Sequence, residues 1–276
     1  IVVAEFSHDK GMLYAGTTLT QIMSQSDTLN MIPKGITRDY PQYEVRSILL
    51  DVARLYMPLD YLTEVSKYAA YFKLNELHLH INDNGGETAY SFRIESLKYP
   101  ELNKGVTTYS QDDYRNYQKE VKKYGIEVVT EIDTPGHSGA IMNIRPDLML
   151  SDGYHLDLTN PESIEFVKTI MDEFLDGADP VFQGSKFHIG ADEYDRTYSE
   201  EVRAYMDDLI KYVNGKGIET RMWASLGKGG FEGNTPVSTD AVVHFWADHD
   251  ADFNEMKTDG YKFINTDGGR IYIVPG

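Results

Sequence analysis

The sequence of 276 residues contains no cysteine. A disulfide framework and a thiolate metal site are therefore impossible, and cysteine usage does not indicate a compartment. Basic residues are also scarce: 26 Lys and Arg against 44 Asp and Glu give 26 − 44 = −18. This charge disfavours nucleic acid and anionic membrane surfaces as partners. No apolar run approaches the roughly 18 residues of a membrane span, so we expect no membrane insertion.

No signal peptide is visible at the start of the sequence. The first residues, Ile1-Val2-Val3-Ala4, are typical of an interior strand, and Ile273-Val274-Pro275-Gly276 directly follows another apolar run. We therefore expect the chain to be a fragment of a longer protein.

Four segments have apolar residues at the helical spacing of three, four and three. They are Leu62-Val65-Ala69-Phe72, Tyr114-Tyr117-Val121-Tyr124, Ile164-Val167-Met171-Phe174 and Val202-Tyr205-Leu209-Tyr212. Short β-rich runs lie between and after them. These runs are Ser47–Asp51, Glu76–Ile81, Glu127–Glu131, Lys186–Gly190, Ile218–Trp223, Ala241–Phe245 and Lys262–Asn265. Strands that alternate with helices indicate parallel pairing through right-handed crossovers.

Seven such strands predict an α/β fold, a (β/α)8 TIM barrel that stops before its eighth strand. A doubly wound open sheet is the alternative, but no Gly-x-Gly-x-x-Gly follows the first strand, which disfavours its nucleotide-binding version. We expect the barrel over residues 46–276. Residues 1–45 precede the first strand of this barrel. Within them, Leu13, Leu19, Ile22 and Met23 suggest a short helix, and Ile36–Tyr43 suggests an extended segment.

Chemically active residues follow the expected strands. Barrel enzymes carry their active sites just after the carboxyl ends of the strands. In chain order these positions hold Arg54, Asp83, Asp133 with His137, Asp192 with Glu193, Trp223, Trp246 and Asp267. The expected barrel therefore gathers acids, a histidine, an arginine and both tryptophans on one face.

The pair Asp192-Glu193 is the strongest signal in the sequence. Two unlike carboxylates at the end of a buried strand can divide acid–base and charge-stabilising work. The motif His188-x-Gly190-x-Asp192-Glu193 resembles the catalytic signature of glycoside hydrolase family 20, the β-N-acetylhexosaminidases. The resemblance extends from about Gly11 to Tyr272. It implies that residues 1–45 are the C-terminal part of a small α+β domain and a linker.

The resemblance implies a substrate-assisted mechanism. In this family the 2-acetamido oxygen of the substrate attacks the anomeric carbon and forms an oxazolinium. It implies that Asp192 orients and stabilises the acetamido N–H, and that Glu193 is the general acid/base. His137, in the segment Thr134-Pro135-Gly136-His137, matches the family histidine beside the acid, and Asp83 matches the residue that orients this histidine.

The resemblance also implies four substrate-binding residues. Arg54 matches an arginine that grips the ring hydroxyls, a bidentate task that suits a guanidinium. Trp223 and Trp246 match tryptophans that wall the acetamido pocket, and Tyr272 matches a tyrosine that hydrogen-bonds the acetamido oxygen.

The sequence departs from the family at two places that touch recognition of the sugar. Val274 stands where the family has an acid that binds outer hydroxyls. The usual Gln-Gly-Trp-Arg is replaced by Asn84-Gly85-Gly86-Glu87 and a longer loop that reaches Phe92-Arg93. These changes leave room for an extended substrate such as a terminal disaccharide.

A metal site is the main structural alternative for two histidines. His78 and His80 lie on one strand with one residue between them, so both rings point to the same face. Some barrel metallohydrolases begin their metal site in this way, and His188 could also point inward. Because no lysine or aspartate completes such a set, we expect no metal, and we expect these rings to fill the barrel interior with hydrogen bonds.

The sequence thus predicts a glycoside hydrolase that removes β-linked N-acetylhexosamine from non-reducing ends through an oxazolinium intermediate, without a cofactor. Three alternatives stay open: a lacto-N-biosidase that releases a Gal-GlcNAc disaccharide, a metal-dependent barrel hydrolase, and a non-catalytic carbohydrate-binding fragment. The expected partner is a glycan with terminal N-acetylhexosamine or lacto-N-biose. The resemblance implies an extracellular or cell-surface location.

Overall fold

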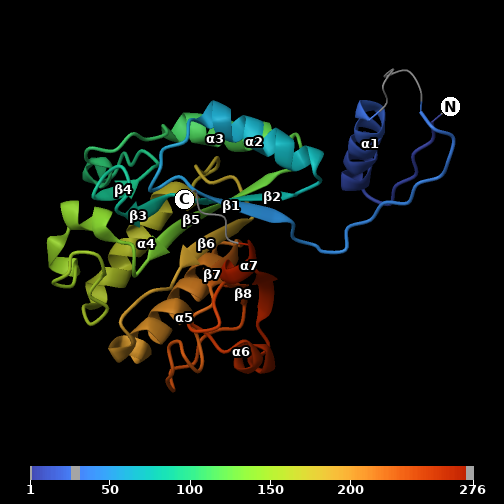
Figure 1. The fold of residues 1–276 in the computed structure, drawn as a ribbon. Coiled ribbons are helices and arrows are strands. Elements are labelled where there is room, and N and C mark those ends of the chain that lie inside the picture. The colour runs from blue at the N-terminus through green and yellow to red at the C-terminus, as the bar shows by residue number, and fades with distance from the viewer. Residues whose placement is uncertain (1, 26–31, 272–276) are drawn as a thin grey trace.

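The computed structural model describes residues 2–25 and 32–271. Its centre is a parallel sheet of seven strands in the order β1-β2-β5-β6-β7-β8-β9. The strands are β1 Ser47–Asp51, β2 Glu76–His80, β5 Glu127–Thr134, β6 Lys186–Gly190, β7 Glu219–Trp223, β8 Ala241–Phe245 and β9 Lys262–Asn265. The order follows the chain without the reversal that defines a doubly wound sheet, so that alternative is wrong. The sheet curls with helices on its outside, and its seven strands are those of a TIM barrel (Figure 1).

The four amphipathic segments form the main helices, α2 Leu59–Tyr71, α3 Gln111–Lys122, α4 Pro161–Leu175 and α5 Ser199–Gly215. Two of these helices have an N-cap residue whose side chain accepts a hydrogen bond from a backbone N–H of the first turn. Ser110 accepts the backbone N–H of Asp113 and Asn160 accepts that of Glu162, each at 3.0 Å. These caps satisfy N–H groups that would otherwise lack a partner at the helix start.

The structure adds elements that the sequence did not predict. A hairpin of β3 (Asn82–Asn84) and β4 (Tyr90–Phe92) follows β2, within the segment expected to be a loop. Two short helices, α6 (Phe253–Asp259) and α7 (Gly268–Ile271), flank β9. The shorter 3-10 helices are η1 Pro100–Asn103, η2 Gly139–Asn143, η3 Pro146–Leu148 and η4 Arg196–Tyr198. Between β7 and β8 the chain runs through residues 224–240 without a helix, so the helix–strand alternation is broken there.

The N-terminal segment contains the expected helix, α1 (Asp9–Ser24), which lies beside the end of the barrel farthest from β4 (Figure 1). Gln21 Nε2 donates to the carbonyl of Tyr71, at the end of α2, at 2.5 Å. Arg46, just before β1, donates from Nη2 to the hydroxyl of Tyr14 at 2.8 Å. Residues 32–46 form no helix or strand. The boundary at residue 45 between a small domain and the barrel stays a prediction.

The two faces of the sheet differ in polarity. Along β2, Leu77 and Leu79 belong to the apolar core, whereas Glu76, His78 and His80 alternate with them and are also buried. Other strands repeat this alternation, so charged and aromatic polar side chains fill the barrel interior. No helix in residues 2–25 or 32–271 is long and apolar enough to cross a membrane.

Candidate active site

The acid pair lies directly after β6 on a turn with unusual backbone geometry. Gly190, Ala191 and Glu193 all have positive φ, at 75°, 74° and 44°. A Cβ at Gly190 would lie 1.7 Å from Oδ1 of Asp133, so only glycine leaves space for that carboxylate. The turn therefore places Asp192 inside the barrel, where it is 9% exposed, and leaves the side chain of Glu193 55% exposed.

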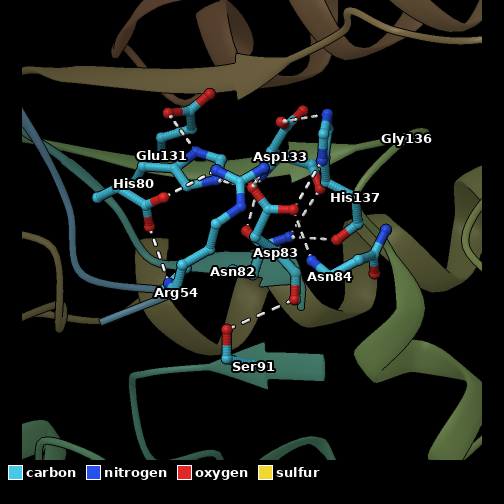
Figure 2. Close-up of polar contacts among 12 residues, drawn as sticks. Arg54, His80, Asn82, Asp83, Asn84, Ser91, Glu131, Asp133, Gly136 and His137 are labelled. Atoms are coloured by element: carbon cyan, nitrogen blue, oxygen red, sulfur yellow. Dashed lines mark hydrogen bonds and ion pairs between the residues drawn. The ribbon is translucent and has the colours of Figure 1, made fainter. Parts of the chain in front are cut away.

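A chain of alternating acids and histidines begins at Glu193. Its Oε2 lies 3.1 Å from Nε2 of His137, whose Nδ1 lies 2.8 Å from Oδ1 of Asp83. Oδ2 of Asp83 lies 2.7 Å from Nε2 of His80, whose Nδ1 lies 2.9 Å from Oε2 of Glu131. Figure 2 shows the part of this chain from His137 through Asp83 to His80 and Glu131. The structure thus brings together three of the four residues predicted to be catalytic, Glu193, His137 and Asp83.

His137 and His80, the two histidines of this hydrogen-bonded series, each face carboxylates with both ring nitrogens. These contacts stabilise the imidazolium form. Burial opposes protonation of His137, but the charge of Asp133 and the hydrogen bonds to Asp83 and Glu193 raise its pKa well above its usual range. Burial likewise opposes protonation of His80, yet Glu131 and Asp83 raise its pKa. Burial would raise the pKa of Asp83, but hydrogen bonds from His137 and His80 hold it well below its usual range.

Arg54 extends the network toward the open side of the site. Its Nη2 lies 2.7 Å from Oδ2 of Asp83, and its Nη1 lies 2.8 Å from Oδ2 of Asp51, at the end of β1. Asp51 also accepts the backbone N–H of Arg54 at 2.9 Å, which fixes the turn after β1. The hairpin turn rests on the same residue, since a Cβ on Gly86 would lie 2.3 Å from the carbonyl oxygen of Arg54.

Asp192 lies within the same cluster but in a drier environment. One potential ligand atom from each of Asp133, His137 and Asp192 lies within 4.8 Å of the others. Burial raises the pKa of Asp192 to about 7, against the effect of His137 and with help from the charges of Glu131 and Glu193. Burial and the charge of Asp192 raise the pKa of Asp133 as well. Oδ1 of Asp192 has no hydrogen-bond partner among the described residues, so it is available to a donor from a bound molecule.

Glu193 differs from Asp192 in the direction of its pKa. The hydrogen bond with His137 lowers the pKa of Glu193, and burial opposes this only in part. The pKa values of these two adjacent carboxyl groups are therefore shifted in opposite directions, as expected when two acids have separate roles.

The predicted substrate-binding aromatic residues are placed unequally. Trp223, at the end of β7, donates from Nε1 to Oε1 of Glu131 at 2.6 Å and so joins the buried network. Trp246 follows β8, and its Nε1 is buried without a hydrogen-bond partner in the described part of the chain. Tyr272 and Val274 lie outside the described residues.

The structure identifies Glu131 as an acid of this network that the sequence did not predict, and it gives Asp133, expected on the active-site face, a place beside His137. Glu131 is fully buried and lies near the ring nitrogens of His78, His80 and His188. Oδ2 of Asp133 lies 3.8 Å from Nε2 of His137. Glu131 alternates along β5 with Glu127, which was the available signal in the sequence, but the register shifts after Glu131, so alternation alone does not place Asp133.

The two histidines considered as a metal pair belong to different clusters. His80 groups with Glu131 and Asp133, whereas His78 groups with His188 and His244. His80 is also the histidine that bridges Asp83 and Glu131. Among residues 2–25 and 32–271, no group of three potential ligands contains both His78 and His80, the pair on which the metal-dependent hydrolase alternative was built, although Oε2 of Glu131 lies near both.

Comparison of the sequence with known proteins also indicates a glycosidase. A lacto-N-biosidase of Bifidobacterium bifidum is 26% identical over 291 residues, which cover 93% of this chain and 24% of that protein. A β-hexosaminidase of Emericella nidulans is 26% identical over 313 residues, or 96% of this chain and 50% of that protein. The chain thus spans between a quarter and a half of the length of these two relatives.

Among solved structures, a β-N-acetylhexosaminidase of Bacteroides fragilis superimposes with a TM-score of 0.78 at 22% identity, over 94% of this chain and 57% of that one. At this identity the similarity establishes the barrel fold. The sequence model described as "Glycosyl hydrolase family 20, catalytic domain" matches residues 43–274, most of the chain. The chain therefore belongs to glycosyl hydrolase family 20.

Proposed function

We propose that the chain is the catalytic part of a retaining glycoside hydrolase that releases β-linked N-acetylhexosamine from non-reducing ends of glycans. The observation that carries this proposal is the hydrogen-bonded chain Glu193–His137–Asp83 beside the buried carboxylate of Asp192. Membership of glycosyl hydrolase family 20 supports it independently.

In the proposed first step the acetamido oxygen of the substrate attacks the anomeric carbon and the glycosidic bond breaks. The leaving oxygen takes a proton from Glu193, and the acetamido group becomes an oxazolinium. Asp192 accepts the N–H of this cation through its unpartnered Oδ1 and balances its positive charge. Glu193 then deprotonates a water molecule, which attacks the anomeric carbon. The bond between this carbon and the acetamido oxygen breaks, so the oxazolinium ring opens and the original anomeric configuration is restored.

Glu193 must carry a proton when it acts as an acid, although its pKa is lowered in the free protein. The proton is close at hand, because Nε2 of His137 lies 3.1 Å from its carboxylate. A sugar that covers the half-exposed side chain would remove water from Glu193 and raise its pKa. Substrate binding would therefore move the proton from His137 toward the leaving oxygen.

A lacto-N-biosidase is the second candidate. Its support is the hairpin of β3 and β4, which replaces the usual Gln-Gly-Trp-Arg segment and rests on Arg54. The valine at position 274 also removes an expected acid. Both changes would alter the part of the site that faces outer hydroxyls of the sugar, and similarity to a lacto-N-biosidase of B. bifidum agrees with this candidate.

The deciding experiment measures p-nitrophenol release by the full-length protein from p-nitrophenyl β-N-acetylglucosaminide and p-nitrophenyl β-lacto-N-bioside, with and without brief EDTA treatment. EDTA-resistant turnover of the monosaccharide substrate would support the exo-hexosaminidase, and turnover of the disaccharide substrate alone would support the lacto-N-biosidase. Turnover of neither would favour a carbohydrate-binding role. Loss of turnover after EDTA in protein that stays folded would favour a metal-dependent hydrolase.

Two substitutions and one inhibitor test the mechanism. Asp192→Asn and Glu193→Gln should each lower kcat by on the order of 10²-fold or more, as expected for a positioned charge and a general acid. A thiazoline that mimics the oxazolinium should inhibit competitively. Full activity of Asp192→Asn together with an inert thiazoline would contradict the substrate-assisted mechanism.

We also propose that the protein acts outside the cell or at the cell surface. The resemblance to a family of commonly secreted glycosidases supports this location. Activity toward an impermeable glycan by intact producing cells or their medium would agree with it, whereas activity released only by lysis would contradict it.

A further inference from the structure

A cluster of three histidines lies in the barrel interior, next to Glu131, the last residue of the hydrogen-bonded chain that starts at Glu193. His78 comes from β2, His188 from β6 and His244 from β8. Their ring centroids are 4.6 Å (His78–His188), 5.3 Å (His78–His244) and 4.7 Å (His188–His244) apart. One ring nitrogen of each lies within 4.8 Å of the other two, and none of the three residues is more than 3% exposed.

The hydrogen bonding of this cluster is incomplete. Neither ring nitrogen of His244 has a hydrogen-bond partner among the described residues, and the same is true of Nε2 of His188. Burying a polar atom without a partner costs free energy, so such atoms normally contact a protein group, an ordered water or an ion. A neutral imidazole has one N–H donor and one lone pair, so the unpartnered nitrogens of His244 include a lone pair that a cation could bind.

Glu131 supplies the support that histidine ligands of metals usually have. Its Oε1 lies 3.1 Å from Nδ1 of His188, and its Oε2 lies 3.0 Å from Nε2 of His78. A carboxylate hydrogen-bonded to one ring nitrogen fixes the ring and leaves the other nitrogen as a ligand, which applies to His188. Nε2 of His78 is close to Glu131 but has no hydrogen-bond partner among the described residues. The N–H of Gly190 also lies 3.1 Å from Nδ1 of His188, so this ring has two possible tautomers. A cation at Nε2 would select the tautomer whose Nδ1 proton points to Glu131.

The charge around the cluster also permits a cation. Arg221 is the fully buried cation on the neighbouring strand β7, and its Nη1 lies 2.8 Å from Oε2 of Glu76. Its Nε also contacts Glu219 at 2.9 Å. Because Arg221 is paired with two acids, its repulsion toward the histidine cluster is reduced.

We infer that His78, His188 and His244 form a binding site for a divalent transition-metal ion, with Zn²⁺ as the best fit. Three imidazoles are a ligand set that Zn²⁺ favours, with Zn–N distances of about 2.0–2.1 Å. Binding would draw the three nitrogens closer together. The ion would connect β2, β6 and β8, so its role is to stabilise the barrel. The proposed reaction at Asp192 and Glu193 needs no participation by this ion.

The first test measures metal binding and stability in the full-length protein. We expect about one Zn²⁺ per chain after gel filtration, determined by mass spectrometry of the metal content. Protein stripped with EDTA should show a lower Tm, and one equivalent of Zn²⁺ should restore it, because a ligand that binds only the folded state stabilises it. Replacement by Co²⁺ should give the visible absorption of a tetrahedral site with nitrogen ligands.

Three variants locate the ion. His244→Gln should raise the Kd for Zn²⁺ by at least roughly tenfold, since it removes one of three ligands. His249→Gln removes a histidine whose side chain is 79% exposed and should leave the Kd unchanged. His137→Gln should also leave it unchanged, which separates this cluster from the one formed by Asp133, His137 and Asp192.

The inference would be overturned if the wild-type protein retained no zinc at saturating Zn²⁺ and showed no change in Tm. Unchanged zinc affinity in His244→Gln would overturn it as well. If His244→Gln does not fold, the Co²⁺ spectrum of the wild-type protein decides: octahedral absorption, or none, contradicts a three-histidine site. None of these measurements uses glycosidase activity, so they are independent of the proposed function.

Discussion

Nε2 of His155 lies 3.1 Å from the carbonyl oxygen of Glu193, to which it donates a hydrogen bond. Nδ1 of the same ring lies 2.7 Å from Oδ2 of Asp152, so a loop beyond β5 is tied to the turn of the acid pair. Glu193 needs this support, because its φ of 44° lies in the left-handed region, which is unfavourable for a residue with a side chain. His155 is therefore a positioning residue for the proposed general acid.

We predict that His155→Gln lowers kcat by roughly three- to thirtyfold with little change in KM, because a displaced acid loses its alignment with the leaving oxygen. Steady-state kinetics on p-nitrophenyl β-N-acetylglucosaminide would measure this, or on the disaccharide substrate if that is the one turned over. Leaving groups that need no protonation should be less affected. The control is His8→Gln, an exposed histidine at the start of α1. Equal kcat values in the two variants would contradict the assignment.

Two aspartates that share Arg54 provide a matched pair. Both Asp51 and Asp83 form an ion pair with its guanidinium, but only Asp83 also contacts His137. We expect Asp51→Asn to act mainly on KM through the orientation of Arg54. Asp83→Asn should also lower kcat, by on the order of 10²-fold, because His137 loses the carboxylate that orients it. Similar effects of both substitutions on kcat would show that Asp83 acts through Arg54 alone.

Stability measurements at several pH values should distinguish the effect of Asp192 on folding from that of Glu193. The pKa of Asp192 is about 7 in the folded protein and 3.8 in the reference state, so the unfolded chain loses this proton first as pH rises. The folded state is thus destabilised progressively from about pH 4 to pH 7, with a constant penalty above pH 7. Asp192→Asn should therefore raise the Tm, by about 2–4 °C for each kcal/mol of relief. Thermal unfolding at pH 4, 6 and 8 should show the largest gain at pH 8.

Glu193→Gln should change the Tm in the opposite direction. Its pKa is lowered in the folded protein, so the ionised form contributes stability above the pKa of the unfolded chain, and this contribution is lost as pH falls. Replacing it should lower the Tm slightly at neutral pH, with a small effect because the side chain is half exposed. A rise in Tm for both variants would contradict pKa shifts of opposite direction in Asp192 and Glu193.

Two adjacent residues on the turn after β6 offer a test of its geometry. Gly190→Ala should reduce both Tm and kcat strongly, because the added Cβ would overlap Oδ1 of Asp133. Ala191→Gly should change stability by no more than about 1 kcal/mol, since relief of the left-handed backbone offsets the loss of a buried methyl and the greater freedom of the unfolded chain. Urea unfolding and kinetics of both variants would measure this contrast. A tolerated Gly190→Ala would mean that Asp133 can move without consequence.

The barrel could be predicted from sequence because each of its elements is encoded locally. Four of the strands, including β6, have the residue bounds expected from their apolar runs, and the caps at Ser110 and Asn160 mark helix starts. The hairpin of β3 and β4 was not predicted, because Asn82–Asn84 is polar and Gly85-Gly86 suggests a loop. Its strands are held by contacts made in the folded protein, such as the hydrogen bond from Arg93 Nε to the carbonyl of Val52.

The candidate site was predictable only where strand ends carry recognisable motifs. The inward-facing residues of β5 and β8, such as Glu131 and His244, occur in runs that simply look buried. Which of them meet depends on curling the sheet, because β2 and β8 are four strands apart in its order. Periodicity indicates that a side chain points inward, but it does not indicate its partner across the barrel.

The hairpin after β2 has two parts with different tolerance to change. β3 contains Asp83, which is fixed by contacts to His80, His137 and Arg54, whereas the turn at Gly85-Gly86 lies above the backbone of Arg54. A longer or shorter turn would therefore reshape the outer wall of the sugar site and leave the position of Asp83 unchanged. Substrate range could thus diverge among relatives through insertions at residues 85–89, while the proton-transfer residues are retained.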